Sequence, residues 1–399
     1  MGILKTITEE YFGNIIREED LIDIHDLNVE IVSFTDNNGK KHRKGYKPKD
    51  KDTLKKLLKR MIEVRGDEGD FNDIDTSDIK DMKLLFQFHI KFNGNITGWN
   101  VSSVIDMSGM FYGATSFNQP IGNWDVSSVI DIHYMFCNAT SFNQPIGNWK
   151  FPNVEKMNSM FSSASSFNQP IGDWEFPKVT DMSGMFYDAK SFNQPIGNWE
   201  FPNVIDMSGM FSYAKSFNQD ISKWKFPNVI YMNRMFYGAK SFNQDVSKWK
   251  FPNVTDMNHM FAYASSFNQD ISKWKFPNVT DMNHMFAYAT SFNQPIGNWE
   301  FPNVINMSSM FSGATSFNQP IGNWVFPIVR YMSGMFSYAT AFNQDISNWK
   351  FPYVTDMSGM FSYATAFNQD LSKWDLKGKE KTKIFNGCPI KKEYKPKMK

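Results

Sequence analysis

The chain has 399 residues with 42 basic and 41 acidic side chains, so its net charge of +1 singles out neither a polyanion nor a polycation as partner. A single hydrophobic core stops growing at roughly 250–300 residues, so this length predicts either several domains or a repeat array. Two cysteines, Cys137 and Cys388, lie far apart in the sequence and exclude a disulfide framework, and the lack of an 18-residue apolar run argues against a membrane span.

The first residues bear on targeting. Lys5, Glu9 and Glu10 interrupt the place where the apolar region of a signal peptide would lie, so we expect no secretory signal and a cytoplasmic location. Met1 to Thr6 reads Met-Gly-Ile-Leu-Lys-Thr, which fits the N-myristoylation pattern. Gly2 is therefore a candidate lipidation site through which the chain could be anchored to a membrane.

Two segments precede the repeats. Residues 1–50 are expected to form a small N-terminal unit whose fold is undefined, apart from a strand over Leu27 to Phe34 and a hairpin turn over Asp36 to Gly39. Residues 51–70 are expected to form an amphipathic capping helix and a linker. The apolar side chains that recur at helical spacing there are Leu54, Leu57, Leu58, Met61 and Ile62.

A 25-residue repeat occupies residues 71–374. Met-Phe and Phe-Asn pairs keep this period without an insertion, and so do all twelve tryptophans. One unit is too short to bury its apolar side chains alone, so we expect about twelve coils stacked on a shared core. The structural core tryptophans are Trp99, Trp124, Trp149, Trp174, Trp199, Trp224, Trp249, Trp274, Trp299, Trp324, Trp349 and Trp374.

Spacing within one unit predicts its local structure. Trp124 and Val126 alternate as in a short strand, a turn follows, and residues 129–132 can form a second extended piece. Over residues 107–114 the apolar spacing changes to three and four, which predicts one or two helical turns. The expected fold is a repeat solenoid, mainly β with short helical turns.

Two polar positions of the repeat need an explanation. The corner is Pro-x-Gly in some coils, as at Pro120, and Asp-x-Ser in others, as at Asp220. Proline fixes φ and aspartate accepts a hydrogen bond from the amide two residues on, so both predict a structural turn. Asn118 and its equivalents recur in every coil, and two interpretations stay open: a ladder of buried amides or an exposed turn.

Residues 375–399 are expected to form a C-terminal cap and a basic tail. A second basic block, Lys40 to Arg60, lies before the repeats. Such blocks are usually solvated flanks. The sequence contains no known nucleic-acid-binding module, so a nucleic-acid partner is not expected.

The unit Met-x-x-Met-Phe-x-x-Ala-x-Ser-Phe-Asn-Gln-x-Ile-x-x-Trp resembles the BspA-like leucine-rich-repeat surface proteins, in their 25-residue Met-Phe version, over residues 71–374. The resemblance implies a right-handed leucine-rich-repeat-like β-solenoid, adhesive or partner-binding roles and no catalytic residues. That version occurs in bacterial surface lipoproteins, protists and giant viruses. Because a lipobox cysteine and a signal peptide are not apparent, a giant-virus member with a cytoplasmic or virion-associated location is expected.

The sequence offers few residues for chemistry. We find no His-Cys-carboxylate metal spacing, unique catalytic triad or phosphate-binding loop, and we expect no enzyme, cofactor or metal. His259 and His284 occupy the same position in adjacent coils, where they could chelate a metal or be a by-product of duplication. Lysines flank the tryptophan in three consecutive coils, as a solvated face or a patch for an acidic partner. They are Lys223, Lys225, Lys248, Lys250, Lys273 and Lys275.

These patterns favour a non-enzymatic interaction scaffold that presents an elongated surface to a protein or glycan. Invariant core positions beside variable surface positions support this hypothesis. The alternatives are a structural component of a virion or filament, and an anionic-polymer binder acting through the lysine stripes.

Overall fold

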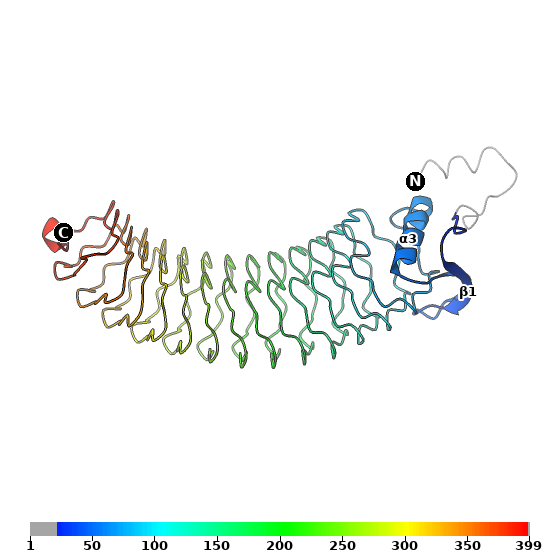
Figure 1. Cartoon of the computed structure of the whole chain (residues 1–399), viewed down its shortest axis with the longest axis horizontal. Coiled ribbons are helices and arrows are strands. Elements are labelled where there is room, and N and C mark those ends of the chain that lie inside the picture. Colours follow the sequence, from blue (N-terminus) through cyan, green and yellow to red (C-terminus); the bar gives the residue numbers. More distant parts are fainter. Residues whose placement is uncertain (1–21, 398–399) are drawn as a thin grey trace.

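The computed structural model describes residues 22–397, so Gly2 lies outside the described residues. The chain forms an elongated, bowed array of stacked coils with a strand pair and a helix at its N-terminal end (Figure 1). Among residues 22–397, no helix has both the length and the apolar character that crossing a bilayer requires.

A hairpin begins the described chain. Strand β1 (Val29–Thr35) pairs antiparallel with β2 (Lys41–Pro48). In the turn between them, Asp36 Oδ1 accepts the N–H groups of Asn38 and Lys40 at 3.0 and 2.9 Å. A parallel bridge joins Tyr46 of β2 to Ile74, so the hairpin is continuous with the first coil.

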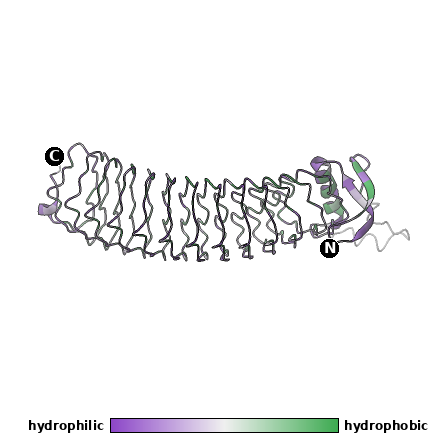
Figure 2. Cartoon of the chain, turned by 90° about the horizontal axis from the view of Figure 1, so that it is seen from below, coloured by the Kyte–Doolittle hydropathy of each residue, from purple (hydrophilic) through white to green (hydrophobic). Residues whose placement is uncertain are grey.

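Helix α3 (Lys51–Arg65) covers the N-terminal end of the core. It begins after Asp50, whose carboxylate accepts the N–H of Thr53 at 2.9 Å, and it ends at Gly66 with φ of 79°. Leu57 and Met61 are fully buried in the same cluster as the first coil. Figure 2 shows hydrophobic residues on α3, in contrast to the hydrophilic 3-10 helix η1 (Lys392–Tyr394) at the other end.

The helical turns predicted at residues 107–114 are wrong, since α3 is the only α-helix in residues 22–397. The amides of Met107, Gly109, Phe111 and Gly113 donate to carbonyls of the next coil, so they cannot close helical hydrogen bonds. Gly109 and Gly113 have φ of 58° and 71°, outside the right-handed helical region. The segment is a series of reverse turns.

The predicted strand at Trp124 and Val126 is also absent, although both side chains are buried. Neighbouring coils are instead joined by single parallel bridges, such as Asp106 to Asp131, along the whole array. Backbone hydrogen bonding between coils therefore replaces extended strands. The repeats are turns held in register, and the expectation of a mainly β chain is too strong.

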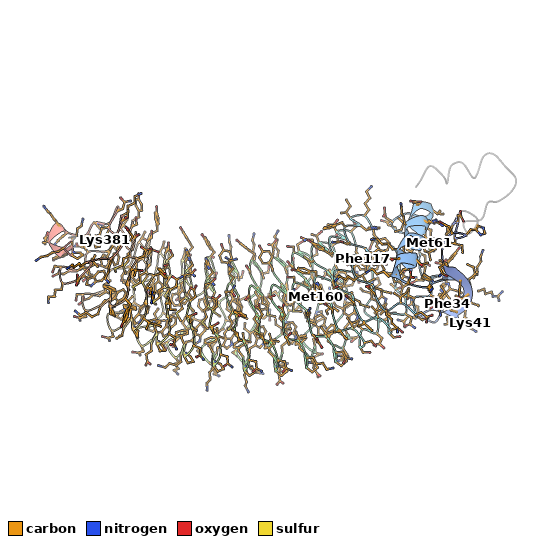
Figure 3. All side chains as sticks on the ribbon, in the orientation of Figure 1. Phe34, Lys41, Met61, Phe117, Met160 and Lys381 are labelled. Carbon is orange, nitrogen blue, oxygen red and sulfur yellow. The ribbon has the colours of Figure 1, made fainter. Side chains whose placement is uncertain are left out.

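The core is a stack of rings. No tryptophan is more than 4% exposed, and Phe117 and Met160 inside the array are fully buried (Figure 3). The distance between the centroids of equivalent rings in neighbouring coils gives the step from one coil to the next. This step is 5.6 Å between Phe111 and Phe136 but 6.4 Å between Trp224 and Trp249. The coils therefore splay on the tryptophan side, which accounts for the bend of the array.

The C-terminal segment completes the last coil. Phe385 stacks on Phe361 at 5.7 Å, so Ile384 and Phe385 replace a Met-Phe pair. The N–H of Leu371 donates to the Tyr394 carbonyl in η1. Lys381 lies at this end of the molecule (Figure 3). Cys137 and Cys388 are both free thiols.

Candidate interaction surfaces

The recurring asparagines form an internal ladder. Asn93 Oδ1 accepts the N–H of Asn118 at 2.9 Å, and Gln119 Nε2 donates to the Asn93 carbonyl at 2.7 Å. The pattern continues to Asn368, which accepts the amide of Lys391. Of the two interpretations the ladder is correct, and the asparagine side chains are used in hydrogen bonds between coils.

The corners are structural as well. Asp220 Oδ1 accepts the Ser222 N–H at 2.9 Å, as the spacing predicted. This backbone hydrogen bond, the Ser222 hydroxyl and the nearby Lys223 hold the pKa of the Asp220 carboxyl below its ordinary value. In the other corner type, a Cβ on Gly122 would lie 2.3 Å from the Pro145 carbonyl oxygen, so glycine is required by close approach.

The lysine rows are on the surface. All six predicted lysines are exposed, and each pair flanks a buried tryptophan in coils 220–275. Within the part of the chain that the structure describes, one of the six forms an ion pair, Lys275 with Glu300 at 3.3 Å. Three successive coils thus present exposed rows of lysines, and the corner aspartates Asp220, Asp245 and Asp270 offset part of the charge of Lys223, Lys248 and Lys273.

A shallow groove of about 1240 Å³ runs across several coils, from Glu155 to Ile328. Sequence reasoning missed it, since it treated the segment after Val126 and its equivalents, which is Pro-Asn in most later coils, only as a turn. Its signal was an asparagine that recurs in five consecutive coils and is followed two residues later by isoleucine or threonine. These residues are Asn203, Ile205, Asn228, Ile230, Asn253, Thr255, Asn278, Thr280, Asn303 and Ile305.

A row of tyrosines near the Met-Phe segment is another surface that sequence reasoning missed. The rings of Tyr263 and Tyr288, 43% and 40% exposed, stack at 4.7 Å. The hydrogen bond between Tyr213 and Tyr237, together with burial, raises the pKa of Tyr237 to about 12. The recurrence of tyrosine after Met-Phe could have identified this row.

The two predicted histidines meet. Their rings stack at 4.4 Å with 5° between planes, and each Nδ1–H donates to a neighbouring asparagine Oδ1 at 3.0 Å. Burial, followed by His284 and Arg234, lowers the pKa of His259 to about 4. Residues 22–397 contain no group of three or more His, Cys, Asp or Glu side chains placed to share a metal ion.

Comparison with known proteins gives one family. The model described as "Mycoplasma protein of unknown function, DUF285" matches four overlapping segments, residues 54–174, 165–262, 221–324 and 296–395. Together they span most of helix α3, the coils and most of the C-terminal segment. No curated protein matches the chain.

Proposed function

Since the chain belongs to the DUF285 family and is a repeat protein, we propose that it is a non-enzymatic interaction scaffold whose elongated surface binds a protein or a glycan. One observation carries the proposal. Most repeated residues are used inside the array, in the ring stack or the ladders, whereas most positions that change from coil to coil are at least partly exposed. A repeat array whose surface varies independently of its core is well suited to recognition.

The test uses the full chain as bait in a pull-down and on a glycan array. We expect at least one ligand that also binds the purified protein directly and that loses affinity when exposed residues are substituted. A complete lack of direct ligands would contradict the proposal, and so would turnover of any ligand by the purified protein.

A second candidate is an anionic-polymer binder, which the six exposed lysines favour. Binding of this kind releases counterions, so affinity for heparin or DNA should fall steeply with salt. Binding to heparin or DNA that is independent of salt would contradict this second candidate.

The proposal also covers the family subtype, the handedness of the solenoid, the origin and the location of the protein. We infer a BspA-like protein with a right-handed, leucine-rich-repeat-like solenoid, of giant-virus origin and located in the cytoplasm or the virion. Proteomics of purified virus particles and of infected-cell cytosol from the source would test the location. A virion or filament component would be abundant in the particles.

A further inference from the structure

The groove asparagines form a row whose hydrogen bonding is half complete. Each donates Nδ2–H to a proline carbonyl of the preceding coil at 2.6–2.7 Å. In residues 22–397 none of the five Oδ1 atoms accepts a hydrogen bond, and all five side chains are exposed. The row consists of Asn203, Asn228, Asn253, Asn278 and Asn303.

The chain itself shows how such an oxygen is used. In the coil before the row, Lys178 replaces asparagine and its Nζ donates to Asn153 Oδ1 at 2.7 Å. At the other end, Ile328 occupies the same position. The open acceptors therefore form one uninterrupted row between these two residues, and a donor from outside the array could bind them.

The spacing of the row selects the donor. The phenylalanines that stand two residues before the asparagines repeat at 6.2–6.4 Å, as for Phe201, Phe226 and Phe251. An extended peptide directs alternate N–H groups to one side, about 6.4–6.8 Å apart. If the asparagine oxygens keep the step of these rings, one N–H per coil meets one Oδ1. A polyproline helix, which repeats every ~9.3 Å, does not match.

Charge selects the side chains. Lys225, Lys250 and Lys275 each stand three residues before an asparagine of the row, and all are exposed. Lys275 pairs with Glu300 at 3.3 Å, whereas Lys225 and Lys250 form no ion pair in the described chain. Like charges held in register repel one another, so carboxylates of a partner would stabilise this arrangement. The isoleucine and threonine side chains of the groove provide an apolar surface for the alternate residues of the partner.

We propose that the groove binds an extended, acidic segment of another polypeptide, two residues per coil. Its alternate N–H groups bind the asparagine oxygens and its carboxylates face the lysines. The inference rests on the proposed scaffold function and names the partner chemistry for that surface.

The test is display selection of random twelve-residue peptides on the full chain. We expect selected peptides to carry Asp or Glu at alternate positions. The affinity of these peptides for the triple variant Lys225→Gln/Lys250→Gln/Lys275→Gln should fall roughly tenfold, because the exposed ion pairs between the three lysines and the peptide carboxylates are lost. Three exposed lysines of another face, substituted together, provide the matched control and should bind with unchanged affinity: Lys190, Lys215 and Lys240.

A second variant tests the asparagines. Asn228→Ile/Asn253→Ile/Asn278→Ile copies the residue that the chain already has at Ile328, so the array should fold. We expect its peptide affinity to fall, with no change in circular dichroism. N-methylation of one alternate set of peptide amides should abolish binding, and methylation of the other set should be tolerated.

Three results would overturn the inference. In the first, the selection enriches no peptide. In the second, the selected peptides bind the two lysine variants with equal affinity. In the third, heparin or DNA binds in a lysine-dependent way and peptides do not compete with it. A partner that binds regardless of both variants would leave the scaffold function standing and remove this assignment.

Discussion

The indole N–H groups of the twelve tryptophans differ in whether they have a hydrogen-bond partner. Eleven tryptophans donate Nε1–H to a carbonyl of the preceding coil, as Trp149 does to Ile121 at 3.3 Å. The buried Nε1 of Trp124 has no partner in the described chain. An unpaired buried donor is destabilising, so this ladder of indole hydrogen bonds is least stable at Trp124.

This difference predicts the effect of matched substitutions. Trp124→Phe and Trp149→Phe remove the same volume from neighbouring coils, but Trp149→Phe breaks the indole hydrogen bond to the Ile121 carbonyl, whereas Trp124→Phe removes a buried donor that has no partner. We expect Trp149→Phe to lower the free energy of unfolding by about 1–3 kcal/mol more than Trp124→Phe. Equal losses in urea denaturation would contradict the assignment.

The stacked histidines predict acid sensitivity. The folded pKa of His259 is about 4 and its ordinary value 6.5, so the unfolded chain takes up the proton first as pH falls. The melting temperature should decrease between about pH 6.5 and 4, with His284 adding in the same direction. Arg234 of the preceding coil opposes protonation of His259 further, whereas Asp281 favours that of His284.

The control for this prediction comes from the repeat. Gly109 and Gly334 occupy the histidine position in other coils, where φ is positive. His259→Gly/His284→Gly should therefore keep the fold and flatten the loss of stability in acid. An unchanged pH slope would show that other groups are responsible.

At the scale of elements, helix α3 shows which parts of the fold could be predicted. The apolar spacing predicted it from Lys51, and the strand and turn of the hairpin were predicted similarly, because these elements are defined by local patterns. The turns over residues 107–114 were mistaken for helix, since amides bonded to the next coil leave no local pattern.

The candidate surfaces follow the same rule. The lysine rows and the histidine pair were predicted because each depends only on the repeat period. The groove and the tyrosine row also repeat with the period, but which recurring side chains are exposed beside one another depends on how the chain turns within each coil, and the period alone does not define that.

The capping role of α3 can be tested by Leu57→Ala. Leu57 is fully buried against the first coils, so the change should cost about 2–5 kcal/mol. Because each coil contacts only its neighbours, hydrogen exchange should increase in residues 71–99 and remain unchanged beyond residue 300. A uniform increase along the array would contradict this role.

At the scale of the whole molecule, the protein is one continuous stack whose repeated residues maintain register. The tryptophan step of 6.4 Å and the histidine step of 4.4 Å describe one curved body. Its surfaces are extended because equivalent positions from successive coils align. A binding row of any kind therefore depends on coils remaining in register over many units.

Deletion of one complete coil tests this claim most directly. Removing residues 226–250 joins Lys225 to Phe251 and recreates the native Trp-Lys-Phe-Pro sequence, whereas removing residues 226–237 joins unequal halves of two coils. We expect the first protein to unfold in one transition near the wild-type melting temperature. The second should melt in two steps and yield protease-resistant flanks. Equal stability of the two proteins, or unfolding caused by loss of one complete coil, would contradict the stacked array.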